Sequence, residues 1–465
     1  MTHRRCRPLA VAVAALVAMP VALVGAPAAQ AAPSAASVRS QEWWLDDLHL
    51  PAAWSTTKGK GVVVGLVDTG VDATHPDLTG ALVPGKDFSG HGAANGEAPV
   101  SGQPEPQHGT TMAGYIVGRG HGPGHAQGML GAAPEARVMS LSLVDTGGDA
   151  PVASAIKYAA DHRVKVINLS VDNVESAAIR DALKYAEQHD VVVVVASGND
   201  GQDNGMNSYA TYPGVVAVSG YVNDGHFTID SDSNITGPQT DEPTSDRAAD
   251  YLGGVAVSAP YETHDGRQDM VGTTTVTDGS YTEVGGTSNS AAIVSGVVAL
   301  IRSAHPDWNA AQVIDVLIHT AYRQLPEYSP KHGFGIPDAA KAVAASAPSV
   351  CDNPLGSLVT NSAGVWAAIV NKKDALAYTP RCGSSSSSPP SSPSSPATQS
   401  TGASSPASFS PSSASAGASG SSGGVPAWVW IVVAVVVVGG AAGLLLARRG
   451  RGGPPPPGPP APNAP

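Results

Sequence analysis

The sequence predicts an α/β fold in which a mainly parallel sheet is covered by helices on both faces. Short apolar runs rich in valine and isoleucine recur along the chain, and such runs are typical of buried parallel strands. Segments with helical spacing of apolar residues lie between them, and this alternation is the pattern of a parallel sheet with helices on both sides. The predicted strands are residues 62–67, 137–143, 164–170, 191–196 and 215–219.

Two segments between the predicted strands carry apolar residues at positions i, i+4 and i+7, which gives each helix one apolar face to lay on the sheet. Further helices are predicted at 289–303 and from His108 onward. Asp68 and Asn199 follow the ends of predicted strands, where parallel α/β folds place their working residues. The apolar positions are Val152, Ile156 and Ala159 in the first segment and Ile179, Leu183 and Ala186 in the second.

The first 31 residues have the pattern of an export signal. Three arginines lie within residues 3–7, residues 9–24 are apolar, and Ala29, Gln30 and Ala31 fit a cleavage site with small residues. We therefore predict a signal peptide at 1–31, whose removal also discards Cys6.

The other end of the chain predicts a tether and a membrane anchor. Residues 383–424 are dominated by Ser, Pro, Ala and Gly and carry no charge, so we predict a disordered linker. The 21 uncharged residues 427–447 are long enough to cross a bilayer, and we place a transmembrane helix at 425–447. Arginines 448, 449 and 451 follow, which predicts a cytoplasmic Pro-rich tail at 448–465 and a folded body outside the cell membrane.

The charge of the exported body excludes some partners. Without the signal and tail arginines, 20 basic and 38 acidic residues remain, a formal charge of −18, so nucleic acid is not expected as a partner. In an oxidising exterior the two remaining cysteines, Cys351 and Cys382, predict a disulfide within a C-terminal extension at 348–382. Two thiols without matching histidine spacing do not suit a zinc site.

Ser288, at the head of an apolar helical run, is a candidate nucleophile. A serine hydroxyl needs a base within hydrogen-bond reach and a third group that orients the base, and His108 and Asp68 supply those residue types upstream. Each residue alone has a simpler interpretation. Ser288 is a good helix N-cap, Asp68 and Asn199 suit turns, and His108 suits a loop.

Three segments in the order Asp, His, Ser resemble the signature blocks of subtilisin-like serine proteases, over residues 41–347. A fourth, 196–199, is similar to the segment whose asparagine helps to form the oxyanion hole of that family. The resemblance implies a peptidase domain at 32–347, with Ser288 as nucleophile, His108 as general base, Asp68 orienting it, Asn199 as oxyanion donor and no cofactor for catalysis. The three blocks are 67–71, 108–114 and 286–288.

A finer resemblance is to mycosins, the membrane-anchored subtilases associated with type VII secretion. It rests on the start of the domain at Gln41, only nine residues after the predicted cleavage, on the segment 118–122, and on the single C-terminal span with its short basic tail. The resemblance implies a polypeptide substrate and type VII secretion machinery as a partner. An alternative function is a structural component of a secretion complex, with proteolysis secondary.

The resemblance also implies two substrate-binding segments, and this chain departs from the family pattern in one of them. Where the family has a leucine and two glycines, this chain has Val171, Asp172 and Asn173, whose side chains we expect to narrow the cleft and restrict specificity. Asp172 would favour a basic substrate residue. Asn289 stands where the family has a small or apolar residue, and Ala292 stands where it has a proline. Because Asn289 follows Ser288 directly, we expect it to alter the oxyanion geometry. The predicted substrate-binding residues are Ser170, Val171, Asp172, Ala196, Ser197 and Gly198.

The sequence contains two other candidate sites. Asp77 matches a calcium ligand of many subtilases, but the loop expected to supply its partners is the Gly- and His-rich stretch 118–128, so a structural calcium is possible but not favoured. The Asp-Thr-Gly segment at Asp68 recurs at Asp145, and paired segments of this kind mark aspartic proteases. That class would need a β-rich body, which the intervening helical patterns argue against.

Overall fold

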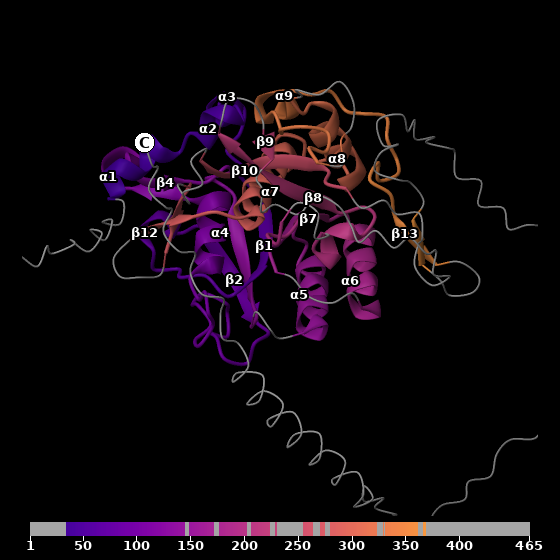
Figure 1. Ribbon diagram of the computed structural model, residues 1–465, viewed down its shortest axis with the longest axis horizontal. Helices are drawn as coiled ribbons and strands as arrows, with labels where there is room; N and C mark the ends of the chain where they lie inside the picture. Colours follow the sequence, from indigo (N-terminus) through magenta and orange to yellow (C-terminus); the bar gives the residue numbers. More distant parts are fainter. Residues whose placement is uncertain are drawn as a thin grey trace, which may run out of the picture. The chain divides into compact units, whose positions relative to one another are not determined.

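A sheet of eight strands crosses the centre of the described part of the chain (Figure 1). The computed structural model describes residues 34–144, 148–171, 176–201, 206–223, 228–229, 254–263, 270–274, 280–322, 329, 331–360 and 366–368. The path of the sheet is β10-β8-β7-β6-β1-β5-β2, all parallel, and β9 pairs antiparallel with β8. The predicted fold class and all five predicted strands are confirmed. The strands are β1 Val63–Asp68, β2 Leu82–Asp87, β5 Arg137–Ser142, β6 Val166–Leu169, β7 Val192–Ala196, β8 Val216–Asn223, β9 Thr228–Ile229 and β10 Val257–Thr263.

Strand β2 was not predicted, because Pro84 and Gly85 interrupt its pattern. Proline cannot donate to a ladder and is tolerated at an edge, which is where β2 lies. Its register against β5 shifts between Val83 and Lys86, and a Cβ on Gly85 would stand 1.8 Å from the Ser140 carbonyl oxygen. The glycine therefore allows the two backbones to approach at this irregular point.

The helices cover the two faces of the sheet. Because successive side chains of a strand point to opposite faces, Val64 and Leu66 of β1 belong to one core and Val67 to the other. Helices α4 His108–Val117 and α7 Thr287–Ala304 fill the first core, while α5 Asp149–Asp161 and α6 Ala177–Gln188, side by side in Figure 1, cover the second. All four helices lie where the sequence predicts them. The described chain also contains α8 Ala310–His319, α9 Ala339–Val343 and the hairpins β3 Arg119–His121 with β4 Gln127–Leu130, β11 Met270–Thr273 with β12 Tyr281–Val284, and β13 Leu358–Thr360 with β14 Trp366–Ala368.

The N-terminal segment is part of the fold. Its short helices α1 Ala35–Val38, α2 Trp44–Asp47 and α3 Leu50–Ala53 lead into β1, and Trp44 is buried edge-on against Tyr115 of α4. The Arg39 guanidinium donates to the Gly128 carbonyl in β4. The segment is thus attached to both the core and the β3-β4 hairpin.

Glu42 places a buried carboxyl in this segment. Its Oε1 accepts a hydrogen bond from the Leu130 N–H at 2.6 Å, and its Oε2 lies 3.0 Å from Nε of Arg39. The Arg39 Nε–H is directed at the Gly128 carbonyl, so Oε2 has no hydrogen bond. Burial outweighs the attraction of Arg39 and raises the pKa of Glu42 to about 8.

Glu42→Gln is expected to flatten the pH dependence of stability. The raised pKa means that the folded state keeps a proton that the unfolded state, with a pKa near 4.5, releases. The stability from this group is present below the unfolded pKa and is lost as pH rises toward 8. Between about pH 5 and pH 9 the melting temperature should therefore fall more for wild type than for Glu42→Gln. Glu97→Gln, at a half-buried carboxylate, is the control and should track wild type; a Glu42→Gln profile parallel to wild type would contradict the pKa.

The C-terminal predictions fall mostly outside the described residues. Cys351 is disulfide-bonded, and its predicted partner Cys382 is not among the described residues, so the pairing stays a prediction. The signal peptide, the linker and the membrane segment at 425–447 also lie outside them. None of the helices in the described ranges is both long and apolar enough to span a bilayer.

Candidate active site

Asp68 and His108 form a hydrogen-bonded pair at the carboxyl end of the central strand. Asp68 is the last residue of β1 and is 1% exposed; His108 is the first residue of α4. Nδ1 of His108 lies 2.8 Å from Oδ1 and 3.0 Å from Oδ2 of Asp68. The Thr69 N–H also donates to Oδ1 at 2.7 Å, which holds the carboxylate in place. Because an ionised carboxylate only accepts, the imidazole donates from Nδ1 and leaves Nε2 to accept a proton.

Two glycines allow this pair to form. A Cβ on Gly109 would stand 2.3 Å from the Gly70 carbonyl oxygen and 3.1 Å from Oδ1 of Asp68. Gly70 itself has φ +91°, in the left-handed region that favours glycine. The first turn of α4 therefore reaches Asp68 because position 109 lacks a side chain, and Gly70 supplies the left-handed backbone of the turn that follows Asp68.

Ser288 is the second residue of α7, and the helix presents it to solvent. From Thr287 to Arg302 all residues of α7 except Ser288 are buried, and Ser288 is half-buried. The N-cap is Gly286, with no side-chain cap, so the interpretation of Ser288 as a helix cap is wrong. Helices α4 and α7 pack together, and each carries a residue of the predicted triad within its first two positions.

Asn199 is held by the residue that precedes Ser288. Its Oδ1 accepts from the Thr287 N–H at 2.9 Å and lies 2.9 Å from the Thr287 hydroxyl. A backbone N–H can only donate, so the oxygen of the amide must face Thr287 and the Nδ2 group faces away from that contact. Thr287 Oγ1 also accepts from the Gly198 N–H at 3.1 Å, which ties the whole loop to α7.

Thr287 is the site residue that sequence reasoning missed. It lies inside a recognised signature block, yet nothing in the linear sequence indicates that its hydroxyl and N–H reach across 88 positions to Asn199. Asn289, in contrast, does not point at the site. Its side chain is buried and donates to the Val284 carbonyl at 3.3 Å, so the expected effect on the oxyanion geometry does not come from a direct contact of the side chain.

The predicted substrate-binding residues lie at the ends of β6 and β7, but one of them contributes differently from what was expected. Val171 is 5% exposed and packs in the core beneath α5 and α6, so its side chain does not narrow a cleft. Its carbonyl accepts from Nδ2 of Asn207 at 3.0 Å. Asp172 and Asn173 are outside the described residues, so their contribution stays a prediction. Ser170 is half-buried, with its hydroxyl 3.5 Å from the Ser288 carbonyl; Ala196 and Ser197 are buried and Gly198 is half-buried.

Asp77 accepts hydrogen bonds from protein groups in this structure. Its carboxylate is fully buried and accepts from the Met129 N–H at 2.8 Å and the Tyr281 hydroxyl at 2.7 Å, and lies 2.6 Å from Nδ1 of His121. A calcium ion here would have to displace these partners. Among the described residues no group of three or more His, Cys, Asp or Glu side chains is arranged to hold a metal ion.

The aspartic-protease alternative does not fit the fold. Asp145 lies outside the described residues, but the sheet is parallel and covered by helices rather than β-rich. Asp68 is engaged by an imidazole, which is the environment of an orienting carboxylate rather than of one that shares a proton with a second aspartate.

The fold and this site define a serine-protease class, and comparison with known proteins gives the family. The pattern of the subtilase family matches residues 59–357. The chain belongs to the subtilase family, whose members are serine endopeptidases.

Individual relatives cover different parts of the chain. Thermitase from Thermoactinomyces vulgaris is 30% identical over 39% of this chain and 62% of its own length, and mycosin-3 from Mycobacterium tuberculosis is 29% identical over 64% of this chain and 70% of its own length. The chain spans 40% of fervidolysin from Fervidobacterium pennivorans. A crystal structure of MycP1 with the N-terminal propeptide removed matches with a TM-score of 0.51 and 26% identity, over 66% of this chain and 98% of that one.

Proposed function

We propose that this protein is a membrane-anchored serine endopeptidase that hydrolyses peptide bonds outside the cytoplasm. The observation that carries the proposal is the hydrogen-bonded pair of Asp68 and His108 within a subtilase domain. In the proposed reaction Ser288 Oγ attacks the peptide carbonyl, and His108 Nε2 takes its proton and later delivers it to the leaving amine. Water then hydrolyses the acyl-enzyme, and no cofactor is required.

The charge that develops on the carbonyl oxygen would be met by two donors. One is Nδ2 of Asn199, because the contact with Thr287 is made by Oδ1 of the same amide. The other is the Ser288 backbone N–H, since the first N–H groups of a helix have no acceptor within it. We infer narrow specificity from the replacement of the family's two glycines by Asp172 and Asn173.

Location and partners extend this proposal. The signal at 1–31 and the apolar segment at 425–447 support a single-pass protein of the cell membrane, with the peptidase domain outside and the C-terminus in the cytoplasm. Similarity to mycosin-3 and to MycP1 supports an association with type VII secretion machinery, as the resemblance to mycosins implies.

A fluorophosphonate probe tests the activity without knowledge of the substrate. We expect the probe to label the wild-type protein and to spare Ser288→Ala, because only an activated serine reacts. Ser290→Ala, which removes a buried hydroxyl bonded to the Pro260 carbonyl, is the matched control and should still be labelled. Folded wild-type protein that resists labelling would favour the alternative, a structural component of a secretion complex.

A further inference from the structure

A cavity of about 890 Å³ lies at the opposite end of the sheet from the candidate active site. Its wall includes Val63, where β1 begins, and Arg137, where β5 begins, whereas Asp68 ends β1. Strand residues rise about 3.3 Å each, so the five steps from Val63 to Asp68 along β1 separate the two sites by roughly 16 Å. A ligand in this cavity would not occupy the catalytic cleft.

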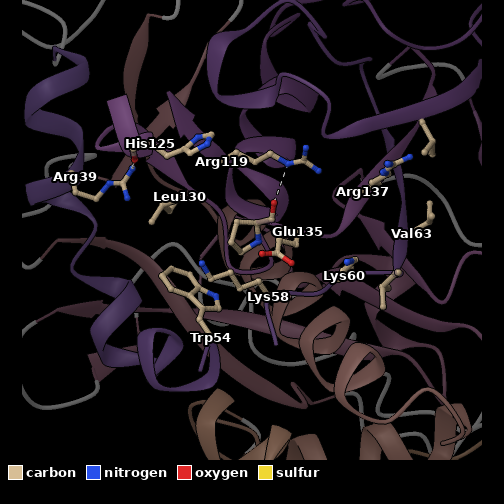
Figure 2. A pocket seen from close by; sticks show the side chains of 15 residues that line it. Arg39, Trp54, Lys58, Lys60, Val63, Arg119, His125, Leu130, Glu135 and Arg137 are labelled. Carbon is tan, nitrogen blue, oxygen red and sulfur yellow. Dashed lines mark hydrogen bonds between the residues drawn. The ribbon is translucent and has the colours of Figure 1, made fainter. Parts of the chain in front are cut away.

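Five cationic side chains line this cavity (Figure 2). The exported body holds 20 basic residues and a formal charge of −18, so a quarter of its cations gather around one cavity of an acidic protein. Glu135 is the carboxylate among the described lining residues. Such a concentration attracts anions. The five are Arg39, Lys58, Lys60, Arg119 and Arg137.

Arg119 is held in place by backbone carbonyl groups. Its Nε donates to the Pro134 carbonyl at 3.0 Å, its Nη2 to the Ala136 carbonyl at 3.2 Å and its Nη1 to the Thr79 carbonyl at 3.5 Å. These neutral acceptors orient the guanidinium, and Glu135 is the carboxylate that partly offsets its charge. Partial burial, and then the nearby charge of Arg137, lower the pKa of Arg119 and outweigh the opposing attraction of Glu135. An anion between the two guanidinium groups, which lie on the same side of the cavity in Figure 2, would relieve their repulsion.

Three of the other four cations are available to a ligand, whereas Arg39 is engaged by the Gly128 carbonyl and Glu42. Lys58, Lys60 and Arg137 are exposed, and their side chains make no ion pair with any described residue. Glu135 lies between Arg119 and the two lysines in Figure 2, and the lining also has apolar side chains, those of Trp54, Val62, Val63, Val83 and Leu130. The Trp54 ring is fixed by a hydrogen bond from its Nε1 to the Ala132 carbonyl at 2.9 Å.

We propose that this cavity docks an acidic polypeptide segment of a partner protein, with carboxylates at the cations and an apolar side chain against Trp54 and its neighbours. A free inorganic anion would leave the apolar wall uncovered, whereas an apolar side chain of a peptide would cover it. The cavity volume lies within the range of pockets that bind ligands larger than a simple ion. A flat bilayer surface does not enter a concave cavity. The site is separate from the catalytic groups, so the proposal stands independently of the proposed proteolysis.

The test is fluorescence anisotropy with the full-length protein and a labelled peptide, Glu-Phe-Glu-Glu-Leu-Glu-Glu. The Ser288→Ala background keeps the peptide from being consumed. We expect saturable binding that weakens with salt, because exposed charges are screened. The triple variant Lys58→Gln, Lys60→Gln, Arg137→Gln should bind at least tenfold more weakly, and the same peptide with Gln for Glu should lose at least as much. Arg137→Gln alone is the milder variant if the triple variant does not fold.

A matched control removes three exposed cations elsewhere, Lys157→Gln, Arg163→Gln, Lys331→Gln, and should bind the peptide like the parent. With Ser288 restored, the cavity variant should react with fluorophosphonate at the wild-type rate, which separates docking from catalysis. Equal peptide binding by the cavity and control variants would overturn the proposal. A second result would also overturn it. The protein would bind phosphatidylglycerol vesicles or inorganic phosphate through Lys58, Lys60 and Arg137, and would not bind the peptide.

Discussion

Replacing Asp68 by asparagine is expected to lower the rate of acylation by roughly four orders of magnitude. Asparagine can keep its oxygen toward the Thr69 N–H, but its amide group would then face Nδ1 of His108. The imidazole would have to accept at Nδ1 and carry its proton on Nε2, where it could no longer take the proton of Ser288. The measurement is the second-order rate constant for fluorophosphonate labelling, which needs no physiological substrate.

Asp72→Asn is the control for this experiment, since it makes the same change four residues later. Asp72 Oδ1 accepts hydrogen bonds within its own turn, from the N–H and hydroxyl of Thr74. Its labelling rate should match wild type, and both variants should keep the wild-type melting temperature within a few degrees. An Asp68→Asn protein that is labelled as fast as wild type would show that Asp68 does not orient the base.

Asn199→Asp is expected to slow acylation by about a hundred- to a thousandfold, the cost of one oxyanion donor. Aspartate keeps the oxygen that accepts from the Thr287 N–H, so the loop stays anchored. It loses the Nδ2 donor and places a negative charge near the developing oxyanion. The loss should appear in the acylation rate, with the affinity for a reversible peptide inhibitor changed far less, because the donor acts mainly on the transition state.

Substitutions at Thr287 test whether Asn199 acts by anchoring its loop or by donating a hydrogen bond to the oxyanion. Thr287→Val keeps the N–H to Asn199 and removes the hydroxyl that binds Gly198, so we expect an intermediate loss, and Thr287→Ser should restore the rate. If Asn199→Asp acylates at the wild-type rate while Thr287→Val is slow, Asn199 serves only to hold the loop and the second oxyanion donor must lie elsewhere.

The layout of the fold could be predicted from local patterns. Valine-rich runs and helical spacing marked β1, β5, β6, β7, β8 and the four large helices, because burial on both faces leaves a strong composition signal. The edge strand β2 was not predicted, because Pro84 and Gly85 break the strand pattern and only the pairing of β2 with β5 makes it a strand. Val171 was misjudged for a related reason. Two residues after the end of β6, its side chain can face the cleft or the core, and the packing of α5 and α6 decided for the core.

The sequence alone determined the identity of the chemical groups and their order along the chain. Asp68, His108, Asn199 and Ser288 stand in blocks whose residue types and spacing are specific, and these need no knowledge of distances. Only the tertiary structure decided how they are oriented. Contacts between distant segments decide which end of the Asn199 amide meets Thr287 and how Gly109 lets α4 reach Asp68. They also decide why five cations from four separate segments of the chain line one cavity. Such contacts leave no periodicity in the chain, because they arise from the crossing of separate elements rather than from the repeat of any one of them.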